Sequence, residues 1–427
     1  HVCFKPRMAI RETAKAFGLP GYEISQLTKK IPWFYHNDEN SFEEQVTRLP
    51  SLRGIELAPP WPEIFKMSQQ LLGLVRYLSV HPGGVIITPK PIEQYAPVEK
   101  ATKGVPIIQW EKDGAEEAGL VKIDILGNRS LGVIRDAIKN IRENGNDFSE
   151  KNWEPEDDQR TKRFVARGKT MGCFYIESPA MRLLQRKANS GDFEQLVLQS
   201  SIIRPAANEF VREYVRRLKG GSWNPLHPLL KDVLDETFGL MVYQEDVSKV
   251  AVSIAGFSHV KADGLRKVLS KKDREKRLRD YNKEFREGCH ENGINPETTE
   301  KIWQMMMSFD GYSFCKPHSA SYAKVSYQAA YLKAHYPAEF MAAVISNQGG
   351  YYSTFSYVSE AKRLGLNILR PDIHKSCYKW FGSNRSLRVG LLSIKGLSQI
   401  TAGRIISKRI KQSFQNMADF LHRVQPT

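Results

Sequence analysis

The chain has 427 residues, more than one compact core accommodates, so we expect it to divide into two to four domains. A hydrophobic content of 41% with 10% aromatic residues excludes a disordered chain, and no apolar run is long enough to span a membrane. The formal net charge of +16 exceeds what solubility requires and favours a polyanionic partner, with nucleic acid as the first candidate.

The chain starts with His1 and no long apolar stretch follows, so we expect no signal peptide and a start inside a longer chain. The five cysteines are far apart and form no Cys-x-x-Cys pair. This spacing argues against a zinc ribbon and against a disulfide framework, and it is typical of a protein in the reducing cytoplasm.

The first 80 residues have apolar positions at helical spacing, interrupted by Gly and Pro clusters. Several Lys and Arg residues lie near the start of this region. We therefore expect a small helical lobe with a basic face. The predicted helices cover residues 8–17, 22–30, 41–49 and 64–78.

Three short apolar segments follow, at residues 85–88, 105–110 and 119–127. Their spacing predicts neighbouring antiparallel strands of one small sheet. His81 precedes the first strand in a Pro-Gly-Gly turn, where a loop-packing role is favoured over the role of a base or ligand.

The third predicted strand places Lys122 and Asp124 on one face, and Val121, Ile123 and Ile125 on the other. The apolar face is expected to be buried. Two interpretations of the charged face remain open. It is either a Lys–Asp pair in solvent, which is the common case, or a pair of catalytic groups held on a rigid element.

The region from Leu131 onward is predicted to be mostly helical, with a polar linker at 144–158. Ser178 is the expected N-cap of the helix that follows it. Arg204 precedes Pro205, which disfavours helical conformation at Arg204. The arginine is then either a ligand contact or part of a surface ion pair.

Residues 239–246, which include Tyr243, are predicted to form a short apolar entry followed by a helix. Residues 261–288 then contain eleven Lys or Arg against six Asp or Glu. Mixed charge runs are usually solvated helix faces, but the surplus around Arg266, Lys271 and Lys272 is large enough to bind phosphates.

Lys316, His318 and Ser319 come together in an aromatic-rich segment ahead of a predicted helix at 320–334. Ser319 is expected to cap that helix, whose free N–H groups favour an anion. Lys316 and His318 are then either phosphate ligands or ordinary polar loop residues. Another helix is predicted at 338–346, after a proline that suits a first turn.

The last segment has the clearest charge signal, because residues 373–418 contain nine Lys or Arg and no Asp or Glu. A turn is predicted at Lys395-Gly396, before a helix at 399–410. Such a turn exposes backbone N–H groups to a phosphodiester. The candidate DNA-binding residues are Lys395, Gly396, Arg404, Lys408 and Arg409.

Together these motifs resemble the alpha subunit of bacterial DNA polymerase III, the C-family replicative polymerases, over nearly the whole chain. The segments that carry the resemblance are His81–Ile86, Gly119–Gly127, Phe174–Ser178, Ile203–Pro205, Val242–Glu245, Ala262–Lys267, Phe309–Tyr327, Tyr331–Phe340 and Ile394–Gly396.

The resemblance implies an α+β fold that is predominantly helical, with a small antiparallel palm sheet. Residues 1–80 would form a thumb-like helical lobe, and residues 81–130 the second part of the palm. Residues 131–375 would form large helical fingers. Residues 376–427 would form a helix-hairpin-helix region that binds the DNA backbone.

The implied function is that of a DNA-directed DNA polymerase in bacterial replication, which transfers nucleotides from dNTPs to a primer 3′-hydroxyl with two Mg²⁺ ions on three palm carboxylates. Asp124 matches the third carboxylate and is the implied catalytic and metal-binding residue. Lys122 matches a position near the incoming triphosphate. The implied nucleotide-binding residues are Arg204, Tyr243, Arg266, Lys271, Lys272, Lys316, His318 and Ser319.

The implied partners are primer–template DNA and dNTPs, with the sliding clamp and other replication-complex subunits in the full-length protein. A membrane partner is not expected, and the implied location is cytoplasmic. In the family, the other two aspartates lie in a Pro-Asp-x-Asp type motif upstream of the segment that matches His1. We therefore expect an internal fragment that is inactive alone.

Two other functions remain open from the residues. One is a non-catalytic DNA-binding protein derived from the polymerase, and the other is an RNA-binding helical protein with a generally basic surface. Ala206-Ala207 and Lys324 depart from the family pattern and suggest a divergent branch. The motifs do not distinguish chromosomal replication from accessory, error-tolerant synthesis.

Overall fold

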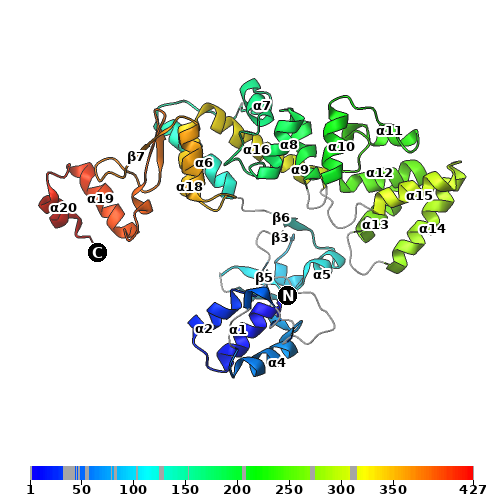
Figure 1. The fold of residues 1–427 in the computed structure, drawn as a ribbon, viewed down its shortest axis with the longest axis horizontal. Helices are drawn as coiled ribbons and strands as arrows, with labels where there is room; N and C mark the ends of the chain where they lie inside the picture. The colour runs from blue at the N-terminus through cyan, green and yellow to red at the C-terminus, as the bar shows by residue number, and fades with distance from the viewer. Residues whose placement is uncertain are drawn as a thin grey trace. The chain divides into compact units, whose positions relative to one another are not determined.

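A computed structural model describes residues 2–31, 44, 46, 49–52, 57–77, 79–80, 84–101, 104–124, 129–151, 153–203, 208–269, 275–307 and 315–426. The chain divides into two compact units, His1–Gly127 and Asn128–Thr427, which run from blue to cyan and from turquoise to red in Figure 1. Across these described ranges, no helix combines the length and the apolar character needed to cross a bilayer.

The first unit begins with a helical lobe, as predicted. Ile10, Ile24 and Ile64 have no exposed surface and lie in its core. The prediction of a helix up to residue 78 is wrong, because Gly73 turns the chain with a φ of +82° and the segment after it pairs as a strand. The predicted helix at 41–49 lies mostly outside the described residues. The elements of the lobe are β1 (Val2–Cys3), α1 (Pro6–Ala16), α2 (Gly21–Thr28), α4 (Trp61–Leu71) and β2 (Val75–Tyr77).

Two separate antiparallel ribbons stand where one three-stranded sheet was predicted. β3 (Gly84–Ile86) pairs with β6 (Lys122–Asp124), whereas β5 (Pro106–Ile108) pairs with β4 (Val98–Lys100). The short helix α5 (Lys112–Glu117) lies between β5 and β6 in the sequence. β5 pairs with its neighbour in sequence because closing a short hairpin costs little loop entropy.

The second unit is predominantly helical and has two large hydrophobic cores. In the first core α17 packs against α6, α16 and α18, and in the second α12 packs against α11, α13 and α14. The helices are α6 (Arg129–Glu143), α7 (Gln159–Ala166), α8 (Pro179–Ala188), α9 (Phe193–Ile202), α10 (Asn208–Leu218), α11 (Leu229–Val233), α12 (Gln244–Ala255), α13 (His259–Leu269), α14 (Glu275–Glu291), α15 (Pro296–Met307), α16 (Lys316–His335), α17 (Pro337–Asn347) and α18 (Thr354–Arg363).

The chain ends in a small sheet and a helical hairpin. The strands β7 (Asn367–Leu369), β8 (Phe381–Ser383) and β9 (Ser386–Arg388) are ordered β7-β9-β8, and β7 and β9 run parallel. The helices α19 (Gln399–Lys411) and α20 (Met417–Val424) follow and share a small core. The predicted α+β, predominantly helical fold with small sheets is confirmed.

Candidate nucleotide and nucleic-acid sites

The β3–β6 ribbon carries the predicted catalytic pair. Its register places Gly84 opposite Asp124 and Ile86 opposite Lys122. A glycine has no side chain to occupy the cross-strand position next to the aspartate. The strand conformation at Asp124 is described, but its carboxylate is outside the described part of the structure.

The prediction that the apolar face of this strand is buried is wrong for Val121 and Ile123, and the third residue of that face, Ile125, lies outside the described residues. Val121 is 69% exposed and Ile123 is 42% exposed. A two-stranded ribbon has no layer of its own to cover its faces, and burial requires further strands or helices. In the described ranges, no group of three or more His, Cys, Asp or Glu side chains could hold a metal ion.

The second unit brings several predicted nucleotide-binding residues together at the starts of α12 and α16. The ring of Tyr243 is buried at the N-terminus of α12, and the ammonium of Lys316 lies 5.6 Å from its centroid. Lys316 also donates to Glu236 at 2.7 Å. Burial lowers the pKa of Lys316, but the hydrogen bond and charge of Glu236 outweigh burial and raise that pKa overall. A phosphate ligand would therefore compete with Glu236 for this cation.

Arg266 joins the same group from α13. Its guanidinium donates to Asp263 at 2.8 Å and to the side-chain oxygen of Gln244 at 3.1 Å. Gln244 follows Tyr243 directly, so Arg266 ties the charged run of α13 to the start of α12.

Ser319 does not cap a helix as predicted, because α16 begins three residues earlier and its N-cap is Cys315. Ser319 is fully buried and accepts a hydrogen bond from Ser201 of α9 at 2.7 Å. His318 lies in the first turn of α16, with its ring 4.2 Å from that of Tyr322. The structure therefore places Lys316, His318 and Ser319 on the helix and not ahead of it.

Asp246 is a titratable group next to this cluster that the motifs did not single out. Its carboxylate accepts the backbone N–H groups of Val242 and Tyr243, each at 2.8 Å. Burial raises the pKa of Asp246 to about 6, although these two hydrogen bonds oppose the rise. The folded protein thus holds this proton more tightly than the unfolded chain does.

Replacing Asp246 by Asn should remove a pH dependence of stability. The stabilising effect of the Asp246 proton is full below the ordinary pKa of 3.8 and is lost as the pH rises through about 6. We expect wild type to gain on the order of 1 kcal/mol relative to Asp246→Asn between pH 7.5 and pH 5, measured by urea unfolding. A wild-type stability that stays constant or falls relative to Asp246→Asn over this pH range would contradict the assignment.

Three predicted nucleotide-binding residues cannot be compared with the structure. Arg204, Lys271 and Lys272 lie outside the described residues, as does His81. Their roles stay predictions.

The C-terminal hairpin shows two kinds of basic residue. Lys395 and Lys408 are exposed, whereas Arg404 donates to the carbonyl of Gln425 and Arg409 to that of Ile373, at 2.8 and 2.9 Å. Arg404 therefore also links α19 to the end of α20, whereas Arg409 links α19 to the segment that follows β7.

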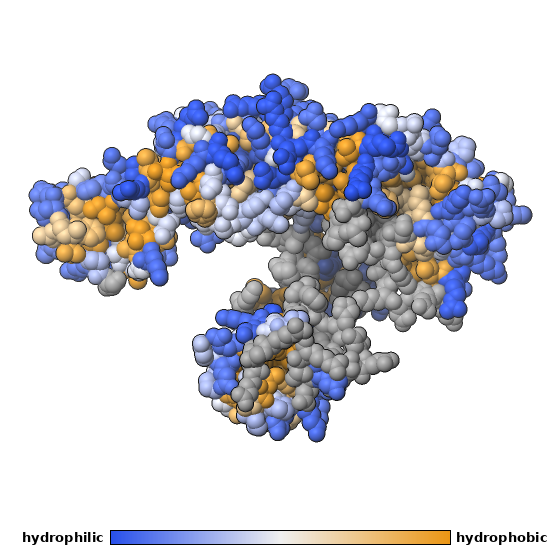
Figure 2. Space-filling model, in the orientation of Figure 1, coloured by the Kyte–Doolittle hydropathy of each residue, from blue (hydrophilic) through white to orange (hydrophobic). Residues whose placement is uncertain are grey.

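The predicted Lys395-Gly396 turn is present. Leu397 N–H donates to the carbonyl of Ile394, and Gly396 has a φ of +86° that favours glycine. Figure 2 shows apolar surface over α19 and α20 beside hydrophilic patches, and the exposed apolar side chains there include Ile400 and Ile410.

Removing both exposed lysines should weaken binding to duplex DNA. We expect Lys395→Gln with Lys408→Gln to lower affinity about 3- to 10-fold and to reduce the salt slope by about 0.9 per lost phosphate contact. Fluorescence anisotropy over a salt series measures both quantities. Lys301→Gln, an exposed and ion-paired lysine of α15, removes a charge elsewhere and should leave the slope unchanged.

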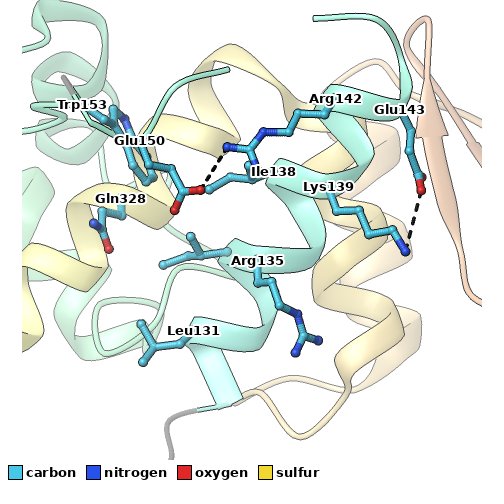
Figure 3. Close-up of a pocket in the computed structure, with 10 residues that line it drawn as sticks. Leu131, Arg135, Ile138, Lys139, Arg142, Glu143, Glu150, Trp153 and Gln328 are labelled. Atoms are coloured by element: carbon cyan, nitrogen blue, oxygen red, sulfur yellow. Dashed lines mark hydrogen bonds and ion pairs between the residues drawn. The ribbon is translucent and has the colours of Figure 1, made fainter. Parts of the chain in front are cut away.

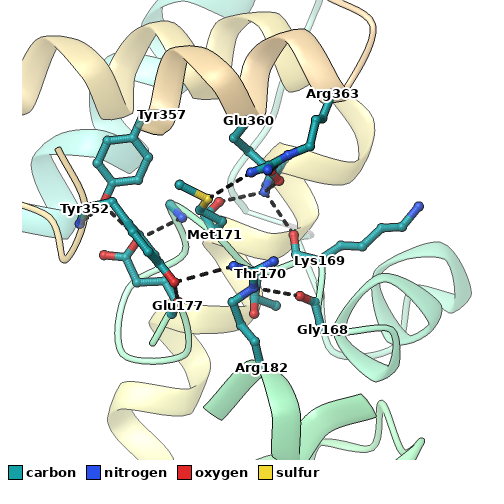
Figure 4. Close-up of polar contacts among 12 residues, drawn as sticks. Gly168, Lys169, Thr170, Met171, Glu177, Arg182, Tyr352, Tyr357, Glu360 and Arg363 are labelled. Atoms are coloured by element: carbon teal, nitrogen blue, oxygen red, sulfur yellow. Dashed lines mark hydrogen bonds and ion pairs between the residues drawn. The ribbon is translucent and has the colours of Figure 1, made fainter. Parts of the chain in front are cut away.

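Sequence reasoning missed the buried polar network of the first core. Lys333 of α16 has no exposed side-chain surface and donates to Glu360 and to the carbonyls of Lys169 and Met171. Figure 4 shows Glu360 beside Arg363 and Glu177 near Tyr352 and Tyr357. The sequence feature that could have indicated this network is a lysine, Lys333, within the apolar run near the end of α16.

A cavity of about 690 Å³ lies along α6, and none of the predicted site residues lines it. Figure 3 shows Ile138 and Leu131 on its floor, with Arg142 paired to Glu150 and Lys139 to Glu143 at its rim. The third cation of its lining, Arg135, pairs with Asp136, which does not line the cavity. The cavity does not coincide with the cluster at α12 and α16.

Comparisons with known proteins agree with the sequence motifs. The family model of the bacterial DNA polymerase III alpha NTPase domain matches residues 2–127, that of the bacterial DNA polymerase III alpha subunit finger domain matches 130–293, and a helix-hairpin-helix motif matches 365–427. The DNA polymerase III subunit alpha of Borreliella burgdorferi is 34% identical over 98% of this chain and 36% of the relative. That of Thermus aquaticus is 30% identical over 98% and 35%. The error-prone DNA polymerase of Symbiobacterium thermophilum is 30% identical over 98% and 41%.

These matches first define a class, the bacterial DNA polymerase subunits. Within that class the chain belongs to the DNA polymerase III alpha subunit family, so the resemblance seen in the sequence is confirmed. The chain spans little more than a third of the length of the Borreliella burgdorferi and Thermus aquaticus relatives.

Proposed function

We propose that the chain contributes the nucleotide-binding and DNA-binding surfaces of a DNA-directed DNA polymerase. The reaction is template-directed nucleotidyl transfer from a dNTP to a primer 3′-hydroxyl. The observation that carries the proposal is the convergence of Tyr243, Arg266 and Lys316 at the starts of two helices. Two cations, Arg266 and Lys316, placed beside helix N-termini suit the negative charge of a triphosphate.

The role that we propose for each segment is the one that the family resemblance implies. Residues 1–80 act as a thumb, 81–130 as part of the palm, 131–375 as fingers and 376–427 as a DNA-backbone contact. Primer–template DNA and dNTPs are the proposed ligands. A sliding clamp and other replication subunits are proposed partners of the full-length protein, in the cytoplasm.

Two Mg²⁺ ions would supply charge stabilisation at the transferring phosphoryl group. The described residues do not fit two such ions by themselves, because they include no cluster of three metal-binding side chains. Asp124 is proposed as one ligand, to be completed by carboxylates from an upstream palm segment. Lys122 shares its strand and is proposed to lie near the triphosphate.

Primer extension tests the proposal. The chain alone is expected to be inactive, and adding the upstream palm segment of a related alpha subunit, fused or in trans, should give template-dependent extension. Extension by the chain alone would contradict the need for further carboxylates. No extension with the segment, together with retained DNA binding, would favour the non-catalytic DNA-binding alternative.

A further inference from the structure

A second cavity lies where the start of α6 meets the loops at 170–178 and 349–351. Its volume is about 240 Å³, the liquid volume of about eight waters, which suits a ligand no larger than a bicyclic ring. Its walls include three aromatic side chains, one arginine and one carboxylate. These are Phe174, Tyr175, Tyr351, Arg129 and Glu177.

Arg129 is the unusual member of this cavity. Its Nη1 is buried, and no described residue accepts a hydrogen bond from that atom. Gly349, with a φ of +69°, lies against its side chain, and a Cβ there would sit 3.4 Å from Cδ and Nε. An unpaired guanidinium nitrogen out of water is costly, so the site favours a ligand that brings acceptor atoms.

Glu177 is held rigidly on the same cavity wall. One oxygen, Oε2, accepts the N–H of Gly172 and the hydroxyl of Tyr357, both at 2.8 Å. The other, Oε1, accepts the N–H of Tyr351 at 2.8 Å, which leaves that oxygen capacity for a second donor. Burial raises the pKa of Tyr357, so its hydroxyl remains a donor to the carboxylate. Figure 4 shows Glu177 beside the Tyr352 and Tyr357 side chains.

The chemistry of the walls selects between ligand classes. A phosphate would satisfy Arg129, but the Glu177 carboxylate on the same wall would repel it. A nucleobase offers acceptors to a guanidinium, donors to a carboxylate and a flat face to aromatic rings. Guanine matches best, since O6 and N7 accept from arginine and its N1 and N2 hydrogens can reach a carboxylate.

We propose that this cavity binds a single unpaired nucleobase of a DNA strand, with a preference for guanine. The inference rests on the proposed function, in which the protein handles single-stranded template. It assigns Arg129 as the base-edge donor, Glu177 as the acceptor and Tyr351 as a stacking surface. None of these three belongs to the nucleotide-binding cluster at α12 and α16.

Binding of short fluorescent oligothymidylates to the whole chain tests the inference. One oligonucleotide carries a central guanine and the other an abasic site at the same position. We expect about tenfold tighter binding of the guanine oligonucleotide, and loss of that preference in Arg129→Gln. Arg135→Gln is the matched control, because Arg135 is also on α6 but is 71% exposed and paired with Asp136.

Tyr351→Ala is a second variant, since Tyr351 is 64% exposed and its truncation leaves the core intact. It should also reduce the guanine preference about threefold or more. Equal binding of both oligonucleotides overturns the inference and leaves DNA binding standing. The inference is also overturned if the preference for the guanine oligonucleotide survives both substitutions. It is overturned as well if Arg129→Gln lowers the affinity for both oligonucleotides by the same factor. Binding of neither oligonucleotide overturns the proposed function together with the inference.

Discussion

Replacing Lys333 by methionine is expected to lower the free energy of unfolding by about 3–5 kcal/mol. The change leaves the Glu360 carboxylate, which is only 9% exposed, without the ammonium 2.7 Å away. It also removes the donor of two backbone carbonyls. Burial raises the pKa of Glu360, and the charge of Lys333 with the hydrogen bonds of Lys333 and Arg363 reverses that rise. The folded state therefore depends on this ammonium.

Lys324→Met is the matched control for this prediction. Lys324 lies on the same helix and is paired with Glu156, but its side chain is 43% exposed. Its loss should cost at most about 1 kcal/mol, because solvent screens an exposed pair. Urea unfolding followed by circular dichroism measures both variants. Equal losses in the two variants would show that burial does not set the energy of the Lys333 pair.

The Lys333→Met, Glu360→Leu double variant separates charge from hydrogen bonding. Removing both charges should recover part of the stability, since a buried ion pair often has little net value against apolar residues. Recovery should be incomplete, because the carbonyls of Lys169 and Met171 still lack their donor. Full recovery would mean that these two hydrogen bonds contribute nothing.

Helix positions were predictable from the sequence because their signals are local. Ser178 accepts the backbone N–H of Met181 at the start of α8, as predicted from short-range capping chemistry. Pro337 occupies the first turn of α17, where its missing N–H costs nothing. The largest error in a predicted helix start was at α16, where Ser319 was expected to be the N-cap but lies inside the helix. It is a buried hydrogen-bond partner of Ser201, and that tertiary contact outweighs its capping preference.

Strand pairing was less predictable because it depends on partners distant in sequence. The alternation of apolar and charged residues around Val121 and Ile123 predicts a buried face only if another strand or helix covers that face. In the two-stranded ribbon both side chains are exposed. The same limit applies to the cluster at α12 and α16. Basic residue types pointed to Lys316, but its pairing with Glu236, 80 positions earlier, follows only from the fold.

Replacing Asp124 by asparagine should abolish nucleotide transfer while leaving DNA affinity unchanged. The expected loss is about 10³-fold or more in kcat/KM, because the proposed role of Asp124 is to hold a divalent ion at the reacting phosphate with a negative charge that an amide lacks. The assay is primer extension by the chain complemented with the upstream palm segment of a related subunit. DNA binding by fluorescence anisotropy separates chemistry from affinity.

The control is Glu99→Gln on β4, which removes one carboxylate from the other ribbon of the same unit. Glu99 is exposed, so its loss should change extension by no more than about twofold. Raising the Mg²⁺ concentration should rescue Asp124→Asn at most partly, since loss of the proposed ligand would weaken both the binding and the orientation of the metal ion. If Asp124→Asn retained near-normal extension, the strand that pairs with Gly84 would have only a structural role, and the metal-binding carboxylates would have to come entirely from other residues.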